Sequence, residues 1–121
     1  RAVDYVGLGA VPESIELDST GRLLAAVLMN GSNLAAGDPH AADHGELVIL
    51  QRAGQTFRVS QRLPSGRIPE GVAFTSDGKY LVVQCHPDRE LWVFSVKHGR
   101  VRDTGHRVKV PGFPSGMRAS P

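Results

Sequence analysis

Histidine and aspartate side chains gather in two short segments of this sequence. They are Asp38, His40, Asp43 and His44 in residues 30–45, and His86 and Asp88 in residues 85–89. Neutral imidazole and carboxylate groups bind zinc and related divalent cations, so His40, Asp43 and His44 are candidate metal ligands. No HExxH or paired CxxC motif accompanies them, and polar surface loops collect these residue types readily. The same residues therefore also fit a ligand-binding loop without any cofactor.

Two glutamates, Glu13 and Glu70, each follow a proline. Paired carboxylates can act as general bases or hold a cation. With His86 and Arg118 they form a set of candidate catalytic groups, supplying an acid, a base or a charge that stabilises an anion. The alternative is structural, because a glutamate at a sharp corner can accept hydrogen bonds from backbone N–H groups.

The overall composition excludes several classes of protein. The chain has 121 residues, 40% of them hydrophobic, and can bury a core. Its formal net charge is +2 without a run of like charges, which argues against nucleic acid as a partner. The longest apolar run, Leu23 to Met29, is far below the roughly 20 residues of a membrane span. A single cysteine, Cys85, allows no intrachain disulfide.

An internal repeat indicates which elements position these residues. The segment from Val11 to Leu24 aligns without a gap with the segment from Ile68 to Leu81. A third copy starts at Phe113 and runs to Arg118. After each complete start comes a second match, 46–50 against 90–94. Each complete unit therefore carries four strand signals, a to d.

Turn chemistry and β-propensity predict where those strands lie. In the first unit they are expected at 14–17, 23–29, 47–50 and 57–63. In the second unit they are expected at 71–74, 80–85, 91–96 and 101–110. The a–b turns contain Gly21 and Gly78, which can take the positive φ of a tight hairpin loop. Strand d alternates apolar and charged residues, and charge on an outer strand opposes edge-to-edge pairing.

Repeated units of four antiparallel strands predict an all-β fold made of β-propeller blades. Residues 11–67 would form one blade with a long b–c loop at 30–45, and residues 68–112 the next. Residues 1–10 are expected as the outer strand of a preceding blade, and residues 113–121 as the inner strand of a following one. The alternative is an immunoglobulin-like sandwich, which gives no reason to repeat Pro-Glu at each unit start.

The stretch from Ile68 to Val83 resembles the repeat of the lactonase-like, YVTN-type propellers. The resemblance extends over essentially the whole chain, and the run from Thr104 to Arg118 looks like the C-terminal end of such proteins. It implies a ring of seven blades, of which this chain is the last third, in a bacterial protein that is exported or periplasmic. The family includes sugar-lactone hydrolases, a muconate-cyclising enzyme and many members without known activity. The resemblance therefore implies a fold rather than a chemistry.

Two blades cannot close a ring, so further blades are the expected partners. They belong to the same propeller or to other copies of the chain. Antiparallel order places the b–c loops and the d–a connections on one axial face, together with Glu13, Glu70 and Arg118. Two functions fit this arrangement. The first is a scaffold that binds a small molecule or a protein through Asp38, His40, Asp43, His44 and Asp88. The second is a lactonase-like hydrolase or cyclising enzyme with its site on the axial face.

Overall fold

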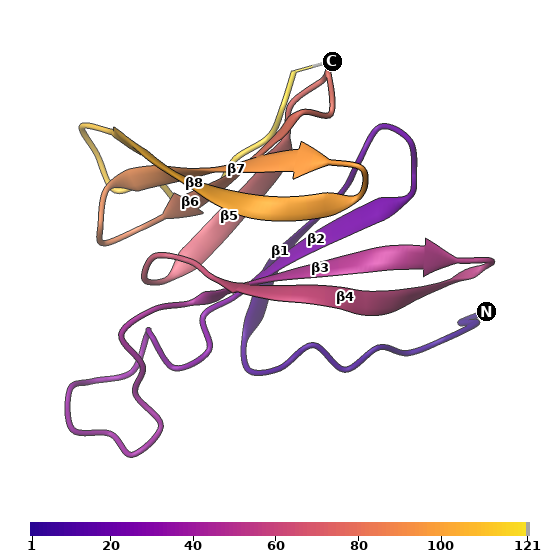
Figure 1. Cartoon of the computed structure of the whole chain (residues 1–121). Helices are drawn as coiled ribbons and strands as arrows, with labels where there is room; N and C mark the ends of the chain where they lie inside the picture. The colour runs from indigo at the N-terminus through magenta and orange to yellow at the C-terminus, as the bar shows by residue number, and fades with distance from the viewer. Residues whose placement is uncertain (121) are drawn as a thin grey trace.

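Eight β-strands form two four-stranded antiparallel sheets in the computed structural model, which describes residues 1–120 (Figure 1). Blade 1 consists of β1 (Pro12–Leu17), β2 (Leu23–Leu28), β3 (Glu46–Ala53) and β4 (Thr56–Pro64). Blade 2 consists of β5 (Pro69–Phe74), β6 (Tyr80–Cys85), β7 (Glu90–Lys97) and β8 (Arg100–Lys109). Each sheet is a simple meander, which confirms the predicted blades and differs from the Greek-key connections of an immunoglobulin-like sandwich. Residues 1–120 contain no helix able to cross a membrane.

Both blades begin with the same sharp corner. Val11 and Ile68 directly precede the repeated prolines and have φ values of 55° and 44°. This left-handed region is sterically unfavourable for β-branched residues. A backbone hydrogen bond within each blade stabilises this conformation. Met29 N–H donates to Val11 O (2.9 Å), and His86 N–H donates to Ile68 O (3.2 Å). A β-bulge follows the corner in both blades.

The larger apolar core lies between the two blades. Its buried side chains are Leu23, Ala25, Val27, Leu47 and Ile49 from blade 1 and Val72, Phe74, Leu81, Val83, Cys85, Phe94 and Val101 from blade 2. A smaller cluster, Ala26, Leu28, Val48 and Leu50, lies on the other face of blade 1. The two clusters reflect the alternation of side chains along a strand. Burial of apolar surface, about 25 cal/mol per Å², therefore joins the blades to each other.

A glutamine side chain joins the outer strands of the two blades by bonding both backbone groups of one residue. Gln61 of β4 donates from Nε2 to Val101 O of β8 (2.8 Å), and Val101 N–H donates to Gln61 Oε1 (2.8 Å). Both backbone groups of Val101 that point toward blade 1 are thereby satisfied. We call this contact the Gln61 clamp.

Both outward faces of this pair of blades expose apolar side chains, and on blade 2 the exposed one is Tyr80 (44%). Ile15 and Leu17 of β1 are 58% and 45% exposed, although Val72 and Phe74 at the equivalent positions of β5 are buried. A blade whose face has no neighbour shows this pattern. The two blades therefore form an arc of a larger ring.

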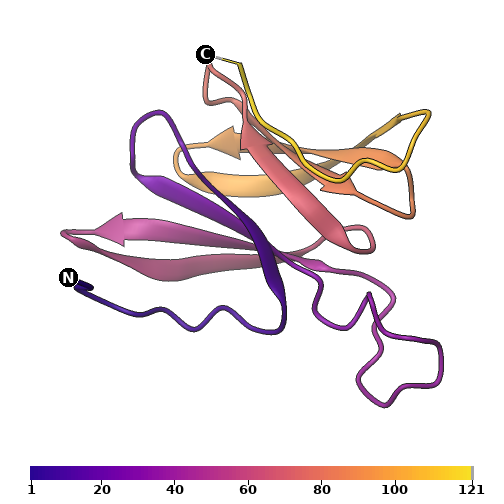
Figure 2. The ribbon, with the colours of Figure 1, turned by 180° about the vertical axis from the view of Figure 1, so that it is seen from behind.

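The segments that flank the blades, residues 1–11 and 110–120, form no strand. The C-terminal segment nevertheless lies beside β5 (Figure 2), where Met117 packs close to Gly71. It is held there by Gln84 Nε2, which donates to Pro114 O. This position agrees with an inner strand of a following blade. That assignment, and the assignment of residues 1–10 to an outer strand, stay predictions, and Pro121 lies outside the described residues.

Candidate ligand-binding face

Strand order brings the b–c loops and the d–a connection to the same edge of both blades, as predicted. The b–c loops are residues 29–45 and 86–89, and the d–a connection is residues 65–68. In Figure 1 the long loop projects at the lower left, while the a–b and c–d turns lie at the other end of each sheet. We call the edge with the long loop the loop face, and the opposite edge the turn face.

The long loop is closed at its base and anchored to both blades. Ala42 N–H donates to Gly31 O (3.1 Å) across the base. Gly31 has a φ of 90°, and a Cβ there would lie 2.2 Å from a backbone oxygen, so only glycine fits. Ser32 is buried, and its Oγ accepts a hydrogen bond from Ile68 N–H of the next blade (2.9 Å). The tip, residues 33–41, is exposed throughout.

Two hollows flank the base of this loop. The first has a volume of 320 Å³ and is lined by Ala10, Val11, Asn30, Gly31, Asn33, Leu34 and His40. The second has a volume of 280 Å³ and is lined by Asn30, His44, Glu46, Arg62, Leu63 and Pro64. A hollow with few polar groups among apolar walls is typical of small-molecule sites, so the first is the better candidate for a small ligand.

The proposed metal ligands His40, Asp43 and His44 are not drawn into one cluster. Asp38 Oδ1 accepts the N–H of His40 (2.8 Å), and His44 Nδ1 lies 2.8 Å from Gly45 O. Nowhere in residues 1–120 do three or more His, Cys, Asp or Glu side chains converge as a metal site. The loop tip thus presents separate polar groups to its surroundings.

Glu70 and His86 meet at the corner of blade 2. His86 Nδ1 lies 3.7 Å from Glu70 Oε2 and 3.0 Å from Pro114 O. The ring of Phe113 packs against His86, with centroids 5.5 Å apart, and the guanidinium of Arg89 lies 5.1 Å from the centre of the same ring. A proton on Nδ1 would be donated to the carbonyl of Pro114, which leaves Nε2 able to accept a proton.

The equivalent glutamate of blade 1 has no such partner. Glu13 is exposed and forms no hydrogen bond or ion pair with the other described side chains. Met29 occupies in blade 1 the repeat position of His86. Arg118 is likewise exposed and has no ion-pair partner in residues 1–120. Of the predicted catalytic set, the structure therefore brings only Glu70 and His86 together.

Asp88 and Cys85 support the connection between the blades. Asp88 Oδ2 accepts the N–H of Arg67 (2.7 Å), so this carboxylate orders the d–a connection. Burial, together with the nearby carboxylates Asp88 and Glu90, raises the pKa of the Cys85 thiol to about 12. Cys85 thus stays a neutral core thiol and not a nucleophile.

Two residues of the Glu70 site were not among the predictions, Arg89 and Phe113. Phe113 occupies the repeat position of Val11 and Ile68, and the change from an aliphatic to an aromatic residue was the available signal. Arg89 has a φ of 53° in the short b–c loop. Sequence offers no rule that places an arginine in this conformation.

No protein-family model matches this sequence. No curated protein matches it either. Among solved structures, the chain is similar to two putative 6-phosphogluconolactonases. For the one from Bacteroides uniformis, the TM-score is 0.69 at 20% identity, over 86% of this chain and 28% of that one. For the one from Bacteroides fragilis, the TM-score is 0.70 at 20% identity, over 87% of this chain and 27% of that one.

The chain is also similar to hydrazine synthase of Kuenenia stuttgartiensis, with a TM-score of 0.68 at 18% identity, over 100% of this chain and 30% of that one. This chain thus spans less than a third of each of the three structures. At these identities the similarity defines the fold alone. It confirms the arc of a β-propeller, and with it the resemblance to lactonase-like propellers at the level of fold.

Proposed function

We propose that this chain is the ligand-binding arc of a propeller, in which the loop 29–45 recognises a small molecule on the loop face. The observation that supports this is the loop itself, because blade 2 connects the same two strands with only residues 86–89. Long loops without secondary structure are uncommon in compact folds and are often functional. An exported or periplasmic location, which the family resemblance implies, belongs to the same proposal.

Loop replacement tests this proposal directly. Residues 33–41 are replaced by a Gly-Ser linker, which keeps the base formed by Gly31, Ser32 and Ala42. A panel of sugars, sugar acids and lactones is then screened by thermal shift against both proteins. A ligand at 100 times its Kd stabilises the native state by about 2.7 kcal/mol, so binders should raise the Tm of the unmodified protein only. Binders that stabilise both proteins equally would contradict a role for the loop.

A lactonase-like hydrolase is the second candidate, and the contact between Glu70 and His86 supports it. With Nδ1 engaged by Pro114 O, Nε2 of His86 would take a proton from water as the water oxygen attacks a lactone carbonyl. The ring C–O bond then breaks, and the same proton returns to the alkoxide. Arg89, whose guanidinium packs on the Phe113 ring that also contacts His86, would supply positive charge to stabilise the tetrahedral intermediate.

Activity measurements separate this candidate from a binding scaffold. Sugar lactones and muconolactone are assayed with the unmodified protein and with Glu70→Gln, His86→Asn and Glu13→Gln. Hydrolysis should fall at least about 100-fold in His86→Asn if His86 is the general base. The loss in Glu70→Gln should be smaller, because this carboxylate, 3.7 Å from Nδ1, only stabilises the protonated ring. Glu13→Gln is the matched control and should keep full activity. Absence of turnover, or turnover that survives His86→Asn, would remove the hydrolase candidate.

A further inference from the structure

The tip of the β7–β8 hairpin, on the turn face, carries an unusual density of positive charge. Lys97 lies directly opposite Arg100 in the pairing of the two strands, and Ser95 lies opposite Arg102. Together with His98 these four residues line a hollow with a volume of about 490 Å³. We call this surface the basic hairpin tip. The sequence conceals it, because the three cations are spread over residues 97–102 and no two are adjacent.

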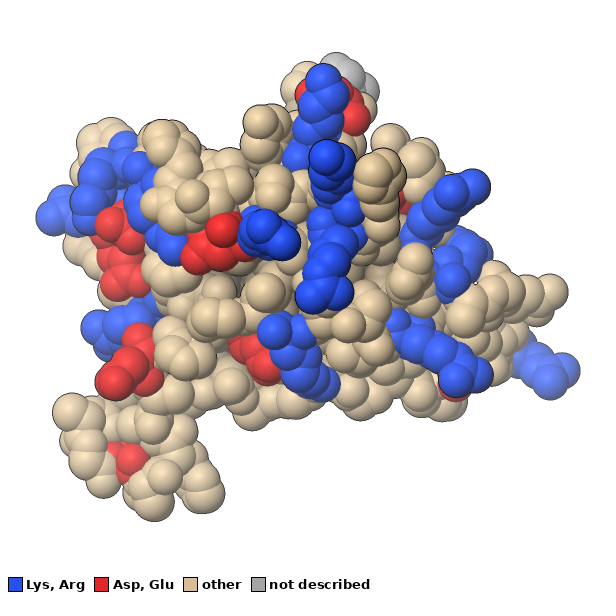
Figure 3. All heavy atoms as spheres, in the orientation of Figure 1, with Lys and Arg blue, Asp and Glu red and all other residues tan. Residues whose placement is uncertain are grey.

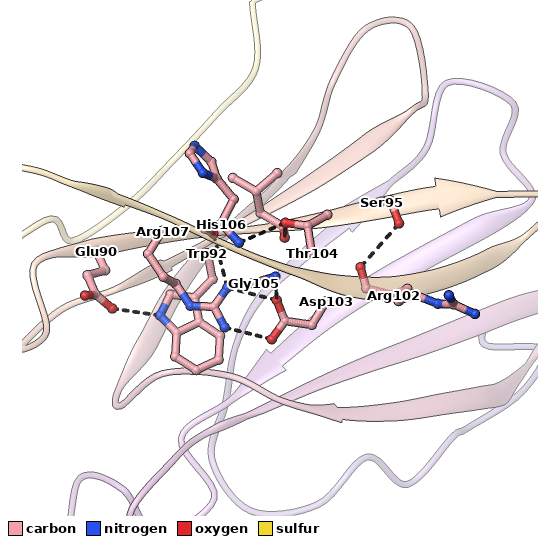
Figure 4. A network of polar contacts seen from close by, with 10 residues as sticks. Glu90, Trp92, Ser95, Arg102, Asp103, Thr104, Gly105, His106 and Arg107 are labelled. Carbon is pink, nitrogen blue, oxygen red and sulfur yellow. Dashed lines mark hydrogen bonds and ion pairs between the residues drawn. The ribbon is translucent and has the colours of Figure 1, made fainter.

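The carboxylates near the basic hairpin tip are already engaged by other groups. Asp103, the closest in sequence, is held by Arg107 through two hydrogen bonds of 2.8 and 2.7 Å. Arg102 points away from this pair (Figure 4). None of Lys97, Arg100 and Arg102 forms an ion pair with a carboxylate of residues 1–120.

The other carboxylates of blade 2 are occupied in the same way. Glu90 accepts a hydrogen bond from Trp92 Nε1 (3.0 Å) and pairs with Lys109 (2.6 Å), while Asp77 pairs with Lys79 (3.8 Å). On the face shown in Figure 3, Lys and Arg side chains gather along the middle, and most acidic side chains lie toward the left. Asp18 and Asp77 line a neighbouring hollow together with His98, but no described carboxylate forms an ion pair with Lys97, Arg100 or Arg102.

Blade 1 provides an internal reference for this hairpin. Ala53 and Thr56 stand opposite each other where blade 2 has Lys97 and Arg100. Like charges directly opposite on neighbouring strands destabilise the pairing. Electrostatic repulsion therefore destabilises the blade 2 hairpin and not the blade 1 hairpin. A bound anion would remove that repulsion.

The internal reference also shows that a neighbouring blade would leave the tip accessible. Blade 2 already packs on the equivalent face of blade 1. Gln51, Ala53 and Arg58, the counterparts of Ser95, Lys97 and Arg102, are nevertheless exposed there. A blade that follows blade 2 with the same geometry would cover the apolar inner part of the face and not the tip.

We propose that the basic hairpin tip binds a tetrahedral oxyanion, a phosphate or sulfate group carried by a small molecule. Two guanidinium groups can grip such an anion through paired N–H donors, and Lys97 adds a point charge. The His98 ring can supply a further donor at the same hollow. Three positive charges match a dianion better than a single carboxylate. This site lies at the opposite end of the blades from the loop face, so it stands independently of the proposed function.

The site is tested by titrating the protein with inorganic phosphate at low ionic strength. NMR amide chemical shifts report the binding. Saturable shifts confined to residues 95–102 are expected. The double variant Lys97→Gln/Arg100→Gln should weaken binding at least about tenfold, since it removes two charge-assisted contacts. Arg102→Gln should weaken binding as well, whereas its matched control on blade 1, Arg58→Gln, should bind phosphate as tightly as the unmodified protein.

A second titration tests whether the anion is bound as part of a small molecule. It compares the affinities for glucose 6-phosphate, glucose and inorganic phosphate. Tighter binding of the ester than of free phosphate supports a phosphorylated small molecule. Equal affinity for the two would replace the small-molecule carrier by the free anion, and overturn that part of the proposal. Shifts spread over all the arginines, or phosphate affinity unchanged in the double variant, would overturn the site itself. Saturable binding of a sulfated polysaccharide without any saturable binding of phosphate would do the same.

Discussion

Blade 1 and blade 2 share the same backbone arrangement and differ mainly in the polar and charged side chains that could bind a ligand or act in catalysis. Both begin with a strained residue before proline, a bulge and a glycine turn. Only blade 1 has the long loop, only blade 2 pairs a corner glutamate with a histidine, and only blade 2 carries the basic hairpin tip. The repeated positions maintain the fold, and the positions that break the repeat are the candidates for function.

The same comparison distinguishes two kinds of buried surface. Phe94 of blade 2 lies in the core between the blades, whereas Leu50, its repeat equivalent in blade 1, lies in the smaller cluster on the opposite face. In that smaller cluster Leu8 of the N-terminal segment packs against the sheet. A segment without strand pairing can relax around a lost side chain more easily than two packed sheets can.

Truncation of these two residues should give the largest effects. Phe94→Ala should lower the free energy of unfolding by about 3–5 kcal/mol, and Leu50→Ala by only about 2 kcal/mol, because Phe94 loses more buried atoms and because its cavity can collapse less. Urea denaturation of the two variants measures the difference. Equal losses would mean that the outer cluster is as rigidly packed as the core between the blades.

The Gln61 clamp should give the next largest effect. Gln61→Ala leaves the N–H and C=O of Val101 without partners, and this should cost about 1–3 kcal/mol of stability. His106 occupies the equivalent position of blade 2 and is exposed, so His106→Ala should change stability by less than about 0.5 kcal/mol. Denaturant unfolding gives both values, and amide exchange at Val101 should accelerate only in the Gln61 variant. Unchanged exchange at Val101 would mean that the clamp opens freely in solution.

A smaller, pH-dependent effect is expected at Asp103. The hydrogen bonds from Arg107 hold the pKa of Asp103 below its ordinary value of 3.8, against the opposing influence of burial. A carboxylate with a lowered pKa stabilises the fold above the unfolded-state pKa, and this contribution disappears as the pH falls through the folded-state pKa. Because the pair is partly exposed, the contribution should be less than about 1 kcal/mol.

Asp103→Asn should therefore lower stability at pH 7 and leave it unchanged at about pH 2, relative to the unmodified protein. The free energy of unfolding in urea at the two pH values measures this. A stability difference that persists at about pH 2 would assign the role of Asp103 to packing and not to its charge.

Most of the fold could be predicted from the sequence, because turn glycines and alternating apolar residues are local signals. All eight strands lie where the repeat places them. The strained corners could not be predicted, since a β-branched residue before proline favours an extended conformation. Val11 and Ile68 adopt positive φ where the residue after strand b donates a hydrogen bond to their carbonyl oxygens, a contact between distant segments.

The candidate sites were predicted less completely, because they depend on contacts between distant segments. The repeat alone placed Glu13 and Glu70 as equals, yet only Glu70 has a histidine beside it. His40, Asp43 and His44 are close in sequence, yet within residues 1–120 they do not converge as a metal site. The basic hairpin tip required strand pairing, which places Lys97 beside Arg100.

The closed base of the long loop also affects how this protein can evolve. Ala42 and Gly31 are joined across the base, and Ser32 is fixed to the neighbouring blade. Insertions, deletions and substitutions within residues 33–41 therefore need not disturb either sheet, since they alter only exposed chain. Selection could therefore change the residues of this tip without destabilising either blade.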